Sequence, residues 1–163
     1  MPASDSPEAA QRAAVVAEAR KWILTPYHSN GDIRGVGVDC GMILVRVFVD
    51  LGLVAPFDPR PYPTDWHLHR SAERYLGFVG AECSRVTDPQ PGDVVVFRYG
   101  RCYSHGGIVT RSNPLTIIHA HMEAGMVVED IVPENPRLSD PERKPLFFSF
   151  WAQDESKAEK AAG

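Results

Sequence analysis

Residues 37–53, GVDCGMILVRVFVDLGL, decide the fold because they join a glycine-rich loop to an almost wholly apolar run at a single cysteine, Cys40. Within that run only Arg46 and Asp50 are charged, and they stand four residues apart. This spacing places both charges on one face of a helix, and Gly52 is a typical residue for its end. The stretch therefore predicts a mostly buried helix with Cys40 at its N-terminus.

The chain before this stretch predicts another helix and then a loop. Ser6-Pro7-Glu8 is a helix-start signal, because it offers a capping hydroxyl, a proline for the first turn and an acid near the positive end of the helix dipole. Apolar residues then recur at helical spacing until Thr25-Pro26. Residues 27–39 are rich in glycine and polar residues, which is typical of a loop that carries functional groups.

The chain after residue 53 changes from helical to β-type patterning. A proline-rich bridge leads to a helical pattern over residues 66–79, and after Gly80 short β-type runs alternate with turns. The predicted strands are Asp93–Tyr99, His105–Thr110, Thr116–His121, Met126–Ile131 and Leu146–Phe150. Helices first and strands afterwards predict an α+β domain, with N-terminal helices packed on a five-stranded antiparallel sheet.

Length and composition favour one domain. The chain has 163 residues, of which 44% are hydrophobic, enough for a single core. We expect that domain to span residues 1–152, followed by a solvated tail over 153–163. A formal charge of -4, without a basic stripe, argues against a nucleic-acid partner.

The sequence shows neither the pattern of a signal peptide nor an apolar stretch of membrane-spanning length. The N-terminus lacks a basic region followed by an apolar core, and no stretch approaches a membrane span, so we expect a protein that is cytoplasmic as synthesised and has no membrane partner. The three cysteines Cys40, Cys83 and Cys102 have long, irregular spacing that is not typical of a disulfide framework.

The candidate chemistry combines a thiol with two histidines. A helix N-terminus and a nearby imidazole lower the pKa of a thiol and make it a nucleophile, which is the situation predicted for Cys40. His105 opens an apolar strand among glycines, and His119 lies on the next strand, where antiparallel pairing could bring it within hydrogen-bonding range. Taken singly, Cys40 is better explained as a small buried hydrophobe, and each histidine is better explained by a structural role.

Five segments, in order, resemble the NlpC-type cysteine peptidases. They are Thr25-Pro26-Tyr27, Val38-Asp39-Cys40-Gly41, Pro91-Gly92-Asp93-Val94-Val95-Val96-Phe97, Ser104-His105-Gly106-Gly107-Ile108-Val109 and Ile117-Ile118-His119-Ala120. Each segment alone is weak, but five in the right order form a specific signal. The resemblance covers roughly residues 12 to 150 and looks closest to the compact members found with phage tails, prophages and gene-transfer particles.

The resemblance implies a papain-like fold and a cysteine endopeptidase without cofactor or metal. It implies Cys40 as nucleophile, His105 as base, His119 as the third polar residue, and Tyr27 as a shaper of the oxyanion site. Gly41 stands where the family commonly has serine, so backbone N–H groups near Cys40 would complete the oxyanion site. The implied substrate is the peptide stem of bacterial peptidoglycan, with phage-tail or particle proteins as further partners that would carry the chain to the cell wall.

Three other interpretations stay open. Cys102, His105, His119 and His121 include good zinc ligands, although the spacing of a standard zinc motif is missing. The domain could instead be a structural component of a phage tail, or an amidase or acyltransferase acting on another amide or ester. His67 and His69 are two residues apart in a predicted helix, cannot share a face, and are expected to be surface or packing residues.

Overall fold

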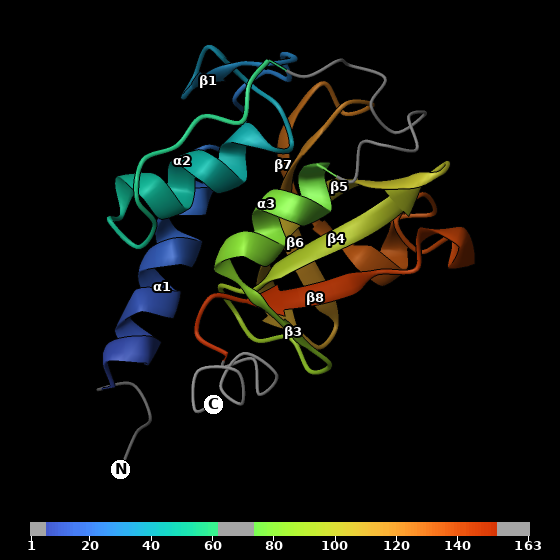
Figure 1. Ribbon diagram of the computed structural model, residues 1–163. Helices are drawn as coiled ribbons and strands as arrows, with labels where there is room; N and C mark the ends of the chain where they lie inside the picture. Colours follow the sequence, from blue (N-terminus) through green and yellow to red (C-terminus); the bar gives the residue numbers. More distant parts are fainter. Residues whose placement is uncertain (1–5, 62–73, 153–163) are drawn as a thin grey trace.

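A computed structural model describes residues 6–61 and 74–152 of the chain. The helices are α1 (Pro7–Arg20), α2 (Met42–Asp50) and α3 (Arg74–Glu82), with two short 3-10 helices, η3 (Val132–Glu134) and η4 (Pro141–Arg143). The strands are β1 (Asp32–Ile33), β2 (Gly37–Val38), β3 (Ser84–Val86), β4 (Val94–Tyr99), β5 (Cys102–Ser112), β6 (Leu115–His121), β7 (Met126–Ile131) and β8 (Leu146–Ser149). Helices α1 and α2 stand next to each other at the flank of the main sheet (Figure 1).

The main sheet has six strands rather than the predicted five. Its order is β3-β8-β4-β5-β6-β7, and the paired strands are antiparallel. The α+β class and the five predicted strands are confirmed, with bounds that differ by a few residues at β5 and less elsewhere. The strand missing from the prediction is β3, whose three residues pair with β8 at the sheet edge. Three residues are too few to establish an alternating pattern in a sequence.

The first helix forms as its start signal predicts. The Ser6 side chain accepts a hydrogen bond from the Ala9 backbone N–H at 3.0 Å, which satisfies a donor that the helix leaves unpaired. Val15, Ala19 and Trp22 recur at helical spacing and are all buried. The apolar face of α1 therefore packs into the core, as the sequence indicates.

Helix α2 is the most buried helix described. Six of its nine residues are buried, and burying an aliphatic side chain fully contributes about 1.5–3 kcal/mol. Arg46 and Asp50 form an ion pair along its exposed side. Gly52 follows with a φ of +72°, a left-handed conformation that suits glycine at a helix end. The core packing of α2 holds the residues just ahead of it in place.

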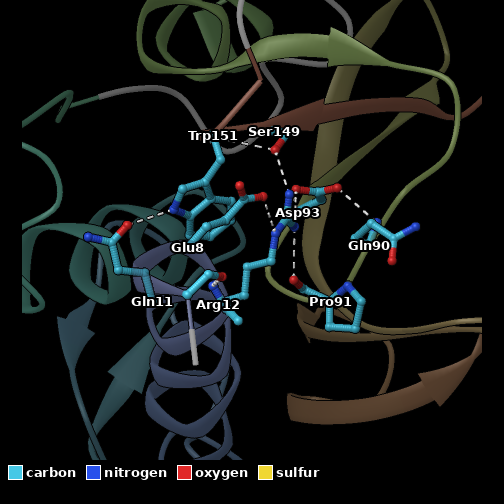
Figure 2. A network of polar contacts seen from close by, with 10 residues as sticks. Glu8, Gln11, Arg12, Gln90, Pro91, Asp93, Ser149 and Trp151 are labelled. Carbon is cyan, nitrogen blue, oxygen red and sulfur yellow. Dashed lines mark hydrogen bonds and ion pairs between the residues drawn. The ribbon is translucent and has the colours of Figure 1, made fainter. Parts of the chain in front are cut away.

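The buried tie between helix α1 and the sheet is Arg12 (Figure 2). The Arg12 guanidinium pairs with the Asp93 carboxylate at 2.8 Å, and the Asp93 side chain is only 1% exposed. Other contacts of Arg12 are with Glu8, the Pro91 carbonyl, the Ser149 hydroxyl and the Trp151 ring, at 2.9, 3.0, 3.2 and 4.3 Å. Because Asp93 begins the segment that leads into β4, this pair fixes the helix against the central strands.

We expect Arg12→Met to lower the free energy of unfolding by about 3 kcal/mol or more, because removing one partner of a buried pair leaves the other charge uncompensated. Urea denaturation followed by circular dichroism measures the change. Lys21→Met is the matched control: Lys21 pairs with Glu18 on the exposed side of the same chain segment, and such surface pairs contribute about 0–1 kcal/mol. Equal losses in the two variants would contradict the structural role of Arg12.

Several expectations fall outside the described residues. They are the tail over 153–163, the start of the helical pattern over 66–79, and the roles of His67 and His69. Within residues 6–61 and 74–152, no helix combines the length and the apolar character that crossing a membrane requires.

Candidate active site

Cys40 lies two residues ahead of α2, against the backbone of β5. Its thiol donates a hydrogen bond to the carbonyl oxygen of Ser104 at 3.4 Å, and the backbone N–H of Gly106 also interacts with the sulfur. Ser104 and Gly106 flank His105 in the sequence. The Cys40 side chain is 5% exposed. The fold thus brings the predicted thiol to the strand of the predicted base.

Asp39 organises the loop on the other side of Cys40. One carboxylate oxygen accepts hydrogen bonds from the backbone N–H groups of Gly41 at 3.1 Å and Met42 at 2.8 Å, and the other accepts one from Asn30 at 2.6 Å. Asp39 therefore binds the N-cap residue Gly41 and the first residue of α2 through their backbone N–H groups, a role that sequence reasoning did not assign to it. The N–H of Gly41, expected near the oxyanion site, donates to Asp39 within the chain.

Tyr27 is held near Cys40 by backbone pairing. Residues 26–28 make two hydrogen bonds with the backbone of Val38, both 3.0 Å long, and Tyr27 pairs with Val38 as an isolated parallel bridge. Burial raises the pKa of Tyr27, and the negative charges that Cys40 and Asp39 can carry raise it further. The phenol therefore stays protonated and can donate a hydrogen bond.

The two predicted histidines are in direct contact, and a carboxylate extends the chain. His105 Nε2 lies 2.7 Å from His119 Nδ1, and His119 Nε2 lies 2.7 Å from an oxygen of Asp130. His105 is 9% exposed and His119 is fully buried. Asp130 also accepts a hydrogen bond from the Asn135 side chain at 3.3 Å. A continuous polar chain thus runs from His105 to a partly exposed acid.

The hydrogen bonds assign the proton positions along this chain. The bond from His119 lowers the pKa of Asp130, so the carboxylate is ionised and accepts the Nε2 proton of His119. With Nε2 of His119 as donor to Asp130, Nδ1 of His119 can accept the Nε2 proton of His105, an assignment that makes both 2.7 Å contacts hydrogen bonds. This leaves the lone pair of His105 on Nδ1, the nitrogen that faces away from His119. His105 is therefore set up as a proton acceptor at Nδ1.

Asp130 is the residue of this site that sequence reasoning missed. In the β6–β7 hairpin His119 is opposite Val128, so Asp130 is the diagonal neighbour of His119 on the same face. Both strands were predicted, and counting the register back from the turn between His121 and Met126 gives this pairing. The signal was therefore present, but it needed the hairpin register as well as the residue type.

Glycine lets β5 and β6 approach where the histidines meet. A Cβ at Gly107 would lie 2.8 Å from the carbonyl oxygen of Ile118 and 3.1 Å from the Cβ of His119. Any side chain there would push the two strands apart. The absence of a side chain at Gly107 therefore allows the 2.7 Å contact between His105 and His119.

The electrostatics correct one expectation. The sequence predicts a lowered thiol pKa, but burial raises the pKa of Cys40, and the charge of Asp39 raises it further. Burial lowers the pKa of His105, as do the positive charges that His119, His121 and Arg143 can carry. Both directions favour the uncharged forms, because a buried sulfur loses the solvation that would stabilise a thiolate. The resting pair is a neutral thiol and a neutral imidazole.

The alternative zinc site of Cys102, His105, His119 and His121 does not assemble in the described residues. Among residues 6–61 and 74–152, the side chains that could jointly hold an ion are His119, His121 and Asp130, and neither Cys102 nor His105 joins them. Cys102 is 1% exposed and opens β5 opposite Tyr99. The spacing Cys102-x-x-His105 therefore does not produce a shared ligand site.

We expect Asp130→Asn to lower kcat about 10- to 100-fold with little change in KM. This is less than the roughly 10⁴-fold cost of an aspartate that orients a base directly, because Asp130 acts through His119. The nitrogen chemical shifts of the His119 ring provide a second measurement: they should show loss of the single Nε2–H form, and Asp130→Glu should restore it. Glu129→Gln, on the same strand, is the control and should keep full activity. A kcat loss with unchanged histidine shifts would contradict the positioning role.

Comparisons with known proteins find solved structures with a similar fold but no match by sequence. No protein-family model and no curated protein matches the sequence. The NlpC/p60 domain of the peptidoglycan hydrolase SagA is 23% identical, with a TM-score of 0.52 over 84% of this chain and 96% of that one. An N-acetylmuramoyl-L-alanine amidase from Bacteroides uniformis is 13% identical, with a TM-score of 0.54 over 84% of this chain and 97% of that one.

A third solved structure, NlpC1 from Trichomonas vaginalis, is 13% identical and has a TM-score of 0.58. The alignment covers 77% of this chain but only 41% of NlpC1, so the likeness concerns one part of that longer protein. At these identities the comparisons establish the fold and leave the activity to the chemistry of the site. The chain has the fold of the NlpC/p60 domains.

Proposed function

We propose that this chain is a cysteine hydrolase of the NlpC type that cleaves an amide bond in the peptide stem of bacterial peptidoglycan. The observation that carries the proposal is the position of the Cys40 sulfur against the backbone on both sides of His105, together with the His105–His119–Asp130 chain. A nucleophile, a base and groups that orient the base are the parts that acyl transfer needs.

The neutral resting pair determines the first step. As the Cys40 sulfur attacks the amide carbonyl carbon, its proton passes to Nδ1 of His105, so that thiolate and imidazolium never need to exist before substrate binds. The positive charge that forms on His105 is stabilised through His119 by the Asp130 carboxylate. The Tyr27 hydroxyl and the Cys40 backbone N–H are the proposed donors to the oxyanion.

The remaining steps return the enzyme to its starting state. The tetrahedral intermediate collapses, the C–N bond breaks, and the leaving amine takes the proton from His105. A thioester remains on Cys40. A water molecule then attacks the thioester while His105 accepts its proton, the C–S bond breaks, and the sulfur recovers the proton. The products are an amine and a carboxylic acid.

The substrate class is supported by the five sequence segments and by the proteins that share the fold. The solved neighbours include a domain of a peptidoglycan hydrolase and an N-acetylmuramoyl-L-alanine amidase. Both names refer to cleavage in one polymer. Peptidoglycan amide hydrolysis is therefore the activity to test first.

Digestion of purified peptidoglycan, with mass spectrometry of the released fragments, tests the proposal. Cleavage within the stem, between D-glutamate and the diamino acid, releases a short peptide and leaves a dipeptide on the sugar. An intact polymer at high enzyme concentration, for a protein whose circular dichroism confirms folding, would overturn the substrate assignment.

A second candidate activity is favoured by the amidase among the neighbours. An amidase would cut between the sugar's lactyl group and the first alanine, so the whole stem peptide would be released. The same digestion separates the two bonds by fragment mass. The Cys40 chemistry is identical in both cases, because each substrate is an amide.

The phage-tail assignment is a finer proposal and rests on the five sequence segments. In it the chain is made in the cytoplasm and reaches the cell wall as part of a phage-like particle. A particle-borne enzyme would be found by mass spectrometry of purified particles from the producing cells. Recovery of the protein only from the particle-free fraction would contradict this proposal.

A further inference from the structure

Three side chains with ligand atoms cluster next to the candidate base. His119 and His121 come from one face of β6 and Asp130 from β7, and one ligand atom of each lies within 4.8 Å of the others. The two imidazole rings are stacked, with centroids 4.8 Å apart and 25° between their planes. The chemistry proposed above uses His119 and Asp130 but not His121.

The cluster can be reached from solvent. His121 and Asp130 line an open hollow of about 540 Å³, large enough for a hydrated cation. The acids Glu123, Glu129 and Glu134 line the same hollow, and Arg137 is the lone basic residue among the described lining residues. Glu123 pairs with Arg137 and Glu129 with Arg20, but together with Glu134 and Asp130 the carboxylates still outnumber these arginines, which favours the entry of cations.

We propose that His119 Nε2, His121 and Asp130 bind a divalent metal ion, with Zn²⁺ as the best match. Two imidazoles and one carboxylate form a donor set that suits zinc, and the hollow leaves a fourth position for water. Zinc bonds of about 2.0–2.2 Å place ligand atoms roughly 3.3 Å apart. His119 Nε2 and Asp130 are already 2.7 Å apart, so the contraction of the cluster comes from movement of the His121 ring toward them.

Metal binding takes two groups out of the proposed catalytic chain. His119 Nε2 and the Asp130 oxygen, 2.7 Å apart, both become zinc ligands, and a ligating nitrogen must give up its proton. Asp130 then no longer accepts a hydrogen bond from His119, and a divalent cation lies beside the ring that contacts His105. That charge opposes the positive charge that His105 must take up from the thiol.

The bound metal is thus an inhibitor. The binding site rests on the cluster geometry alone, whereas the inhibition rests on the proposed hydrolase function. Two separate measurements keep the two claims distinguishable. His121 is the residue to vary, because it belongs to the cluster but not to the proposed catalytic chain.

Equilibrium dialysis of metal-free protein against Zn²⁺, with elemental analysis, tests the binding site. We expect one zinc per chain in the wild type and in Cys40→Ala. His121→Phe, which keeps a stacking ring, and His121→Gln should weaken binding by about 100-fold or more, since losing even a residue that only supports a ligand typically costs 10–100-fold. His28→Gln is the control, because His28 is exposed and outside the cluster.

Unchanged zinc affinity in both folded His121 variants would overturn the site. So would loss of binding in Cys40→Ala, because it would locate the metal on the thiol. A peptidoglycan digestion assay then tests the consequence: Zn²⁺ should inhibit the wild type, a chelator should restore it, and His121→Phe should keep basal activity and resist zinc. Equal zinc sensitivity in the wild type and His121→Phe would overturn the inhibition.

Discussion

Cys40→Ala is expected to lower kcat by at least about 10⁴-fold, because removing the nucleophile of such a hydrolase leaves only substrate binding and oxyanion stabilisation. The structural argument is that the thiol contacts the backbone on both sides of His105, at Ser104 and Gly106. Cys83 interacts electrostatically with Asp93 and Glu82, and Cys102 opens β5 opposite Tyr99. Peptidoglycan turnover and circular dichroism, measured on the same sample, give activity and fold together.

Cys102→Ala is the matched control for this prediction. Cys102 is 1% exposed and Cys40 is 5% exposed, so each alanine variant removes one buried sulfur. Both should lose a similar amount of stability, about 1–2 kcal/mol. Only Cys40→Ala should lose activity. Wild-type turnover in Cys40→Ala would show that Cys40 is not the nucleophile. Equal inactivation of both variants would show that the loss of activity comes from disturbed packing.

The helices and strands that were predicted well from the sequence are those whose defining pattern lies within their own residues. Helix α1 has a capping serine and a regular apolar face, and both act within the helix itself. Strands β6 and β7 are apolar runs bounded by turn residues. Strand β3 has three residues and is fixed by pairing with β8, some sixty residues later in the chain, so its signal is tertiary.

The candidate site was likewise predicted only as far as residue type and order along the chain could indicate it. Residue type and order were enough to nominate Cys40, His105 and His119, and the fold brings these residues to adjoining elements. Asp130 escaped because its role depends on the register of the hairpin. The direction of the Cys40 pKa was wrong because a helix N-terminus and an imidazole are visible in sequence, whereas burial and the exact position of the Asp39 carboxylate are not.

The two histidines are expected to differ in what their replacement costs. His105→Ala should reduce kcat by about 10⁴-fold or more, because it removes the group that accepts the thiol proton and returns it to the leaving amine. His119→Ala should be less severe, since His119 acts on the proton position of His105 rather than on substrate. His119→Gln should retain more activity than His119→Ala, because its amide oxygen can still accept the His105 Nε2 proton.

The raised pKa of the Cys40 thiol adds a test of the role of His105. If a preformed thiolate were the nucleophile, a small external imidazole would do little for His105→Ala. With a neutral Cys40 thiol, the missing step is proton acceptance, so added imidazole should restore part of the kcat of His105→Ala, provided that it enters the space left by the ring. It should not rescue Cys40→Ala. Full activity in His105→Ala without any additive would refute the mechanism, and identical losses in the alanine and glutamine variants of His119 would refute its role in orienting the base.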